Sequence, residues 1–166
     1  YMSDDYAIAP PIAQPDLYVD FVIQTLRKHK LGLLIPTIDS ELTLISRAHE
    51  EITHASGAEI LIGAYSAIQT CADKLATSRY LEKINAPQPK TYESYSQASN
   101  ANNMHSSKII AKPRFGGGSK GIKILGKCDF ELRGINNCEY IFQPFERYIK
   151  EYTAVVIKDD DKITAV

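Results

Sequence analysis

The sequence predicts an α/β chain in two parts, a piece of a doubly wound parallel sheet followed by an α+β unit. Two observations lead to this prediction. In the first part, helical periodicity alternates with short, almost wholly apolar runs, as in parallel strands that are covered on both faces. In the second part, strand-like runs flank a tight glycine loop, which favours antiparallel pairing.

The first part is predicted to alternate between helices and strands. Residues 16–30 are predicted to form a helix, because apolar residues recur there at helical spacing. The apolar run 31–35 is predicted to form the first strand, and residues 59–62 the second. Between them, Ser40 is expected to cap a single helix that continues to Ile52. Short connections between such elements are typical of a parallel α/β layer.

A helical junction is predicted between the two parts. Residues 67–85 are predicted to form two helical segments, and Asp73, where they meet, is expected to cap the second. Pro87 and Pro89 then end the helix and indicate a linker. The inner face of the second segment is expected to consist of Leu75, Tyr80, Leu81 and Ile84.

The second part is predicted to consist of short strands and turns. Residues 94–107 are rich in Ser, Asn and Gln and are expected to form a solvated stretch. Residues 159–161 are predicted to form a hairpin turn before the last strand. The other expected strands are residues 109–112, 121–125, 140–143 and 151–158, with a short helix or turn over 128–136.

Composition restricts the classes of partner. The chain has 166 residues, 44% of them hydrophobic, and a net charge of −1, so no sequence-wide basic field attracts nucleic acid or an anionic membrane. No apolar run approaches the roughly 20 residues needed to span a bilayer. The three cysteines are widely spaced and suggest no disulfide framework, so a cytoplasmic location is the simplest expectation.

The segment with the glycine loop carries the strongest chemical signal. Three successive glycines, Gly116 to Gly118, let the backbone approach a ligand and offer N–H groups to an anion. Lys112 ends the preceding strand, Ser119 adds a hydroxyl, and Arg114 and Lys120 are expected to add positive charge. This combination predicts a grip for a polyphosphate. A plain flexible hairpin with solvated basic residues is the alternative.

The order of the motifs excludes three common nucleotide sites. No G-x-x-x-x-G-K-[ST] motif is present, so the chain is not a P-loop protein. No G-x-G-x-x-G opens a helix after a strand, which argues against a dinucleotide fold. Protein kinases place the glycine loop before the strand lysine, whereas here Lys112 comes first.

The order of motifs that is present resembles that of the ATP-grasp enzymes, and most closely their carbamoyl-phosphate-synthase-like branch. The resemblance depends on Lys112-Pro113, the loop 116–119 and Glu151-Tyr152-Thr153. Residues 33–42 and 71–77 are similar to the domain that precedes an ATP-grasp domain and to the junction between the two.

The resemblance implies a domain organisation for a fragment of a longer protein, truncated at both ends. A partial pre-ATP-grasp doubly wound parallel sheet would be followed by the α+β N-terminal subdomain of an ATP-grasp fold. The implied units are an incomplete pre-ATP-grasp domain over residues 1–70, a helical junction and linker over 71–90, and an incomplete nucleotide-binding subdomain over 91–166.

The resemblance also implies roles for particular residues in binding ATP. It implies that the phosphates are bound by Lys74 and Lys112 and covered by a mobile flap of Gly116, Gly117, Gly118 and Ser119. It also implies that the adenine is bordered by Gln143 to Glu146 and that the ribose is bound by Glu151. Considered without the family, Lys74 could be a helix-surface lysine, Gln143 a polar edge residue and Glu151 a strand-end glutamate in water.

The complete protein is therefore expected to be an ATP-dependent carboxylate–amine ligase. ATP would phosphorylate a small carboxylate, and an amine would displace phosphate from the acyl phosphate. The Mg²⁺ ligands, a carboxylate and a Glu-x-Asn pair, are expected beyond Val166, so the fragment is expected to hold no catalytic or metal-binding residue and to be inactive alone. A non-catalytic nucleotide-binding or regulatory module is the alternative.

Overall fold

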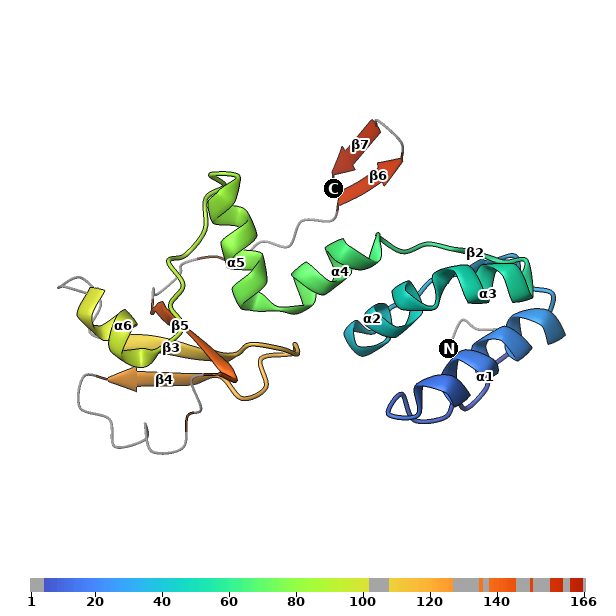
Figure 1. The fold of residues 1–166 in the computed structure, drawn as a ribbon, viewed down its shortest axis with the longest axis horizontal. Helices are drawn as coiled ribbons and strands as arrows, with labels where there is room; N and C mark the ends of the chain where they lie inside the picture. The colour runs from blue at the N-terminus through green and yellow to red at the C-terminus, as the bar shows by residue number, and fades with distance from the viewer. Residues whose placement is uncertain are drawn as a thin grey trace.

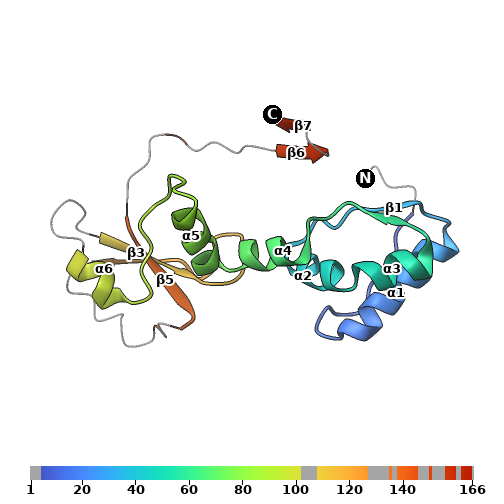
Figure 2. The same ribbon diagram turned by 45° about the horizontal axis from the view of Figure 1, so that its top comes forward.

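The structure is a computed structural model that describes residues 5–101, 108–126, 135, 138–145, 150, 156–159 and 162–165. Apart from a hairpin near the C-terminus, its elements form two groups, and α4 (Tyr65–Ala72) lies between them (Figures 1 and 2). No helix in these residues is long and apolar enough to cross a membrane.

The first group follows the predicted alternation of helix and strand. It consists of α1 (Pro15–Lys28), β1 (Leu33–Leu34), α2 (Asp39–Arg47), α3 (His49–Ser56) and β2 (Glu59–Ile60). The strands pair in parallel, with Leu33 opposite Glu59, which confirms the parallel pairing. The expected cover on both faces is not observed, because Leu33 is 50% exposed. Proline at the first turn of α1 fits the helix because its missing N–H is not needed there.

One apolar core holds the first group together. Leu26 of α1, Ile45 of α2 and Ile52 of α3 are almost fully buried in it, and Leu34 and Ile60 of the two strands pack against them. For α1 the apolar face predicted from Leu17 and Leu26 is only partly correct, because Leu26 is buried but Leu17 is 56% exposed. Tyr18, Val19 and Ile23 form the rest of its buried face.

The predicted single helix after Ser40 is instead two helices, which is a correction. The chain breaks at Ala48, and no glycine or proline marks the break, so the periodicity did not show it. Ser40 lies inside the first turn of α2, and Ile38, which occupies the cap position, makes no side-chain cap hydrogen bond. The second helix ends at Gly57, whose φ of 75° is the left-handed conformation that glycine adopts readily.

The junction is formed by α4 and α5 (Lys74–Lys83), and they meet at Asp73 as predicted. The carboxylate of Asp73 accepts a hydrogen bond from the backbone N–H of Leu75 at 3.0 Å, which confirms the cap. The predicted inner face is only partly correct. Leu75 is buried, but Tyr80 is 54% exposed and Ile84 is 52% exposed, because α5 packs closely only at its first turn.

The second group contains an antiparallel sheet, as predicted. Its strands are β3 (Lys108–Pro113), β4 (Lys123–Gly126) and β5 (Tyr140–Pro144), in the order β4-β3-β5. A separate hairpin pairs β6 (Val156–Asp159) with β7 (Lys162–Ala165), with Asp159 opposite Lys162, which confirms the predicted hairpin.

The polar stretch 94–107 contains a packed helix, contrary to the prediction that it is simply solvated. This helix, α6 (Tyr95–Ala101), places Ala98 in contact with the sheet core, where Ala98 is 1% exposed. The ring of Tyr95 meets Phe142 edge to face, and its hydroxyl donates to the carbonyl of Gly126 at 2.9 Å. Ala98 and Tyr95 thus pack α6 against the sheet, which the Ser and Asn content of the segment did not predict.

A buried tyrosine joins α1 to α2 in the first group. The hydroxyl of Tyr18 donates a hydrogen bond to Oε1 of Glu41. Burial first, and then the Glu41 carboxylate, raise the pKa of Tyr18 to about 12. The pKa is higher in the folded than in the unfolded chain, where it is about 10. The stability from this interaction is therefore complete below about pH 10 and is lost as the pH rises through the folded value.

Tyr18→Phe is expected to lower the free energy of unfolding by about 1–2 kcal/mol at neutral pH, because the hydrogen bond to a carboxylate is lost. The difference from the wild type should shrink above about pH 10, where Tyr18 ionises in the unfolded chain, and should disappear as the pH passes the folded pKa of about 12. Urea unfolding across this pH range measures both effects. Tyr80→Phe, at an exposed hydroxyl, is the control, and a difference that stays constant with pH would contradict the assignment.

Candidate phosphate-binding site

The end of β3 presents a lysine at the entrance to the glycine loop. Ala111 is fully buried on the face of the sheet that packs against α6. Because side chains alternate along a strand, Lys112 lies on the opposite face, where it is one residue from the end of β3. The sheet therefore determines where the Lys112 side chain lies and which face of the sheet it leaves.

Lys74 reaches the same loop from the first turn of α5. Its Nζ donates a hydrogen bond to the carbonyl of Gly116 at 2.6 Å. Burial first, and then the nearby Lys112 ammonium, lower the pKa of Lys74. Lysines that lie 38 positions apart (112 − 74) are thus close enough in space for one charge to act on the other.

The surroundings of the two lysines fit a multiply charged anion. Among the described residues, neither ammonium forms an ion pair, so the two like charges are only partly compensated. The backbone N–H groups of residues 116–119 donate no hydrogen bond to any of the residues that the structure describes. Gly116, Gly118 and Ser119 have φ values of 88°, 66° and 58°, and such left-handed residues help to shape anion-binding concavities.

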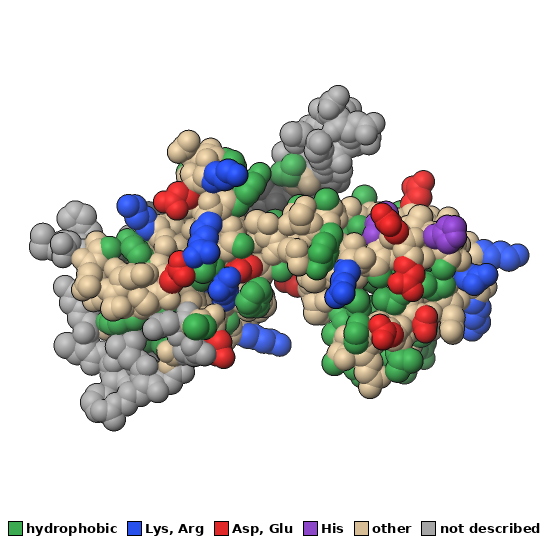
Figure 3. Space-filling view, viewed as in Figure 1, with side chains coloured by type: hydrophobic (Ala, Val, Ile, Leu, Met, Phe, Trp, Pro, Cys, Tyr) green, Lys and Arg blue, Asp and Glu red, His purple; other side chains and the backbone are tan. Residues whose placement is uncertain are grey.

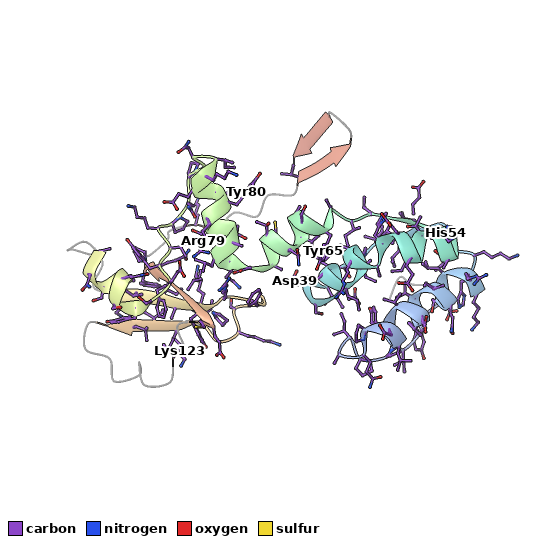
Figure 4. All side chains as sticks on the ribbon, viewed as in Figure 1. Asp39, His54, Tyr65, Arg79, Tyr80 and Lys123 are labelled. Atoms are coloured by element: carbon purple, nitrogen blue, oxygen red, sulfur yellow. The ribbon has the colours of Figure 1, made fainter. Side chains whose placement is uncertain are left out.

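Asp39, the first residue of α2, lies where the first group faces the second (Figure 4). A Cβ atom at Gly117 would lie only 2.7 Å from Oδ2 of Asp39, so the middle position of the loop has room for glycine alone unless Asp39 moves. The Asp39 carboxylate also acts on Lys74, where it raises the pKa and opposes part of the effect of burial.

A cavity of about 870 Å³ lies between the loop and the first group, and Figure 3 shows the surface hollowed there. Its charged groups are supplied by Lys74, Lys120 and Asp39. Apolar side chains from both groups complete the wall, and they include Ile38, Leu42, Ile68 and Phe115. The cavity can therefore hold a small molecule with an apolar body next to Lys74 and Lys120.

Arg114 does not add free charge to the loop, which corrects the expectation from the sequence. Its Nε donates to Oδ1 of Asp73 at 2.7 Å, and its Nη2 donates to Oδ2 at 2.6 Å. The hydrogen bonds from Arg114 hold the pKa of Asp73 below its usual range. Neither the partner of Arg114 nor the contact of Asp39 was predicted, because both join residues far apart in the sequence.

The predicted adenine and ribose residues are only partly described. Gln143 lies on the same face of the sheet as Lys112, and its Nε2 donates to Oγ1 of Thr91 at 2.8 Å. The neighbouring Phe142 exchanges backbone hydrogen bonds with Tyr92, so the outer edge of β5 is occupied there. Glu146 and Glu151 lie outside the described residues. Within those residues, no group of three or more histidine, cysteine or carboxylate side chains could hold a metal ion.

Comparisons with known proteins find a family model and solved structures that match this chain. Residues 71–166, more than half of the chain, match a family model described as an ATP-grasp domain. The crystal structure of D-alanine–D-alanine ligase from Helicobacter pylori matches with a TM-score of 0.54 over 76% of this chain, at 16% sequence identity. No curated protein sequence matches.

The structural match concerns the fold, and this chain covers 42% of the Helicobacter pylori ligase. The family match includes β3, the glycine loop and both lysines. On this evidence the chain belongs to the ATP-grasp family.

Proposed function

We propose that this chain supplies the phosphate grip of an ATP-dependent ligase. The observation that carries the proposal is the convergence of Lys74 and Lys112 on one glycine loop whose N–H groups have no partner in the described part of the chain. Two cations beside such a loop suit a triphosphate, because an anion with several oxygens can bind both ammonium groups and the backbone at once.

Each part of the grip has its own task in this proposal. Lys112 binds phosphate oxygens from the strand end, and Lys74 binds them from the helix start. The loop of Gly116, Gly117, Gly118 and Ser119 folds over the phosphates and excludes water. The strand from Gln143 to Glu146 borders the adenine, and Glu151 accepts hydrogen bonds from the ribose. Residues 1–70 form the preceding domain, 71–90 the junction and 91–166 the nucleotide-binding subdomain.

The reaction that best fits the family is activation of a carboxylate. A carboxylate oxygen attacks the γ-phosphorus, the bond to the β-phosphate oxygen breaks, and ADP leaves with that electron pair. An amine then attacks the acyl carbon of the acyl phosphate, phosphate leaves, and the amine loses a proton. Bound Mg²⁺ would neutralise charge on the phosphates, and its ligands are proposed to lie beyond Val166.

Two features support a small acceptor beside the grip. The cavity of about 870 Å³ opens next to the loop, and Lys74 and Lys120 line it, so a carboxylate inside would find positive charge. The resemblance to the carbamoyl-phosphate-synthase-like branch and the fold likeness to a D-alanine–D-alanine ligase both favour a carboxylate–amine ligase over other uses of ATP.

Lys112→Met and Lys74→Met, made in the full-length protein, are each expected to weaken MgATP binding about 10- to 100-fold, because each removes a charge-assisted contact to phosphate. Isothermal titration calorimetry measures the loss. Lys83→Met, at the far end of α5, is the matched control and should bind like the wild type. Equal affinities in all four proteins would exclude the phosphate grip.

The full-length protein is expected to release ADP in one of two ways. Release needs both a carboxylate and an amine, or it needs the carboxylate alone and leaves an acyl phosphate that added hydroxylamine traps. A coupled ADP assay against panels of both substrates measures this. MgATP binding without ADP release for any pair would contradict the ligase and indicate the non-catalytic nucleotide-binding module instead.

A further inference from the structure

The two grip lysines are connected to each other through a second pair of residues. Asp73 precedes Lys74, and Arg114 follows Lys112 with one proline between them. Arg114 and Asp73 form a bidentate ion pair at 2.7 and 2.6 Å, the geometry in which a guanidinium and a carboxylate restrain each other most strongly. We call these two residues the clamp.

Backbone contacts extend the clamp on both sides. The N–H of Lys74 donates to the carbonyl of Arg114 at 3.0 Å, so the lysine itself is tied to the loop entrance. The N–H of Arg114 donates to the carbonyl of Glu139 at 2.8 Å, next to the start of β5. Asp73 also caps α5 through Leu75. The start of α5 and the end of β3 are therefore held at one fixed separation.

The surroundings of the clamp distinguish it from an ordinary surface ion pair. The Asp73 side chain is 11% exposed and the Arg114 side chain is 30% exposed. In a second ion pair, Arg79 of α5 contacts Glu93, and these side chains are 60% and 55% exposed. The guanidinium of Arg114 also lies 5.5 Å from the ring centroid of Phe115, the residue that opens the loop. An exposed pair such as Arg79–Glu93 contributes little, while a partly buried bidentate pair fixes geometry.

We propose that Asp73 and Arg114 are positioning residues for nucleotide binding, which hold Lys74 and Lys112 together so that both ammonium groups meet the same triphosphate. This inference depends on the proposed function. Without the clamp the two lysines still repel each other. The hydrogen bonds of Lys74 to the carbonyls of Arg114 and Gly116 remain, but neither restrains α5 against the end of β3 as a bidentate ion pair does. One ligand then no longer binds both ammonium groups at once, although both lysines are still present.

The test is a double-mutant cycle with Asp73→Asn and Arg114→Gln in the full-length protein. Asparagine keeps a side-chain oxygen that can cap α5, so Asp73→Asn removes the ion pair more selectively than alanine would. Each single variant is expected to bind MgATP about tenfold more weakly. The double variant should be no weaker than either single one, because the two residues act as a unit. Arg79→Gln, which breaks the exposed pair, should bind like the wild type (Figure 4).

A second measurement separates positioning from mere stabilisation. In Arg114→Gln the pKa of Lys74, followed by NMR of lysine Cε groups, is expected to rise toward its usual value as the two ammonium groups move apart. Urea unfolding shows whether each variant is folded. If Arg114→Gln and Asp73→Asn do not fold, Arg114→Lys, which keeps the charge without the bidentate geometry, carries the test and should bind MgATP more weakly than the wild type.

The outcomes separate the two proposals. If the wild type binds MgATP and the folded clamp variants bind equally well, or if Arg79→Gln loses as much affinity as Arg114→Gln, the clamp has no positioning role and the phosphate grip still stands. Additive losses in the double variant, or an unchanged pKa of Lys74, would also overturn the clamp. If the wild type itself binds no MgATP, the proposed function fails.

Discussion

The candidate site depends on holding two lysine ammonium groups against one loop. Two like charges brought together at a partly desolvated place are unfavourable, and the lowered pKa of Lys74 is the sign of that cost. Asp39 and Asp73 offset part of the cost, since both raise the pKa of Lys74, yet burial and Lys112 outweigh them. A site that remains short of negative charge favours an anionic ligand, and one with many oxygens favours a polyphosphate.

The sheet makes this arrangement precise because its register decides which face each side chain takes. In β3, Ile109 and Ala111 are buried in the core with Phe142, and Lys112 lies on the other face. A slip by one residue would turn Lys112 into that apolar core, which gives the pairing with β4 and β5 a strong energetic preference. The small side chains of Ala98 and Ala111 let α6 lie close to the strand without displacing it.

The sequence predicted features that local patterns determine. The helix–strand alternation, the antiparallel pairing around the glycine loop and the cap at Asp73 each follow from residues within a few positions of one another. Local signals did not show the break at Ala48, where neither glycine nor proline is present. They also did not show the burial of Ala98, because a polar segment was judged by its composition and not by its one inward face.

The candidate site divides in the same way. Lysines and glycines next to each other in the sequence indicated a phosphate grip, and the family resemblance added Lys74. The partner of Arg114 could not be predicted, because Asp73 lies 41 positions earlier (114 − 73) and an arginine beside a glycine loop looks like one more cation for phosphate. Only the fold shows that the Arg114 guanidinium is already paired with Asp73. The predicted roles of Glu146 and Glu151 stay predictions, since both lie outside the described residues.

The three loop glycines serve two different physical requirements, and this difference shows which parts of the chain build the site. Gly116 and Gly118 have positive φ, so the conformation of the loop itself favours glycine there. Gly117 has no such φ, but a side chain there would displace Asp39 of the first group, whose Oδ2 is 2.7 Å from where a Cβ would lie. The family match begins at residue 71, yet the loop contacts a helix that starts at Asp39, and Lys74 comes from the junction. The site is therefore formed where three parts of the chain meet, and the first group takes part in it directly.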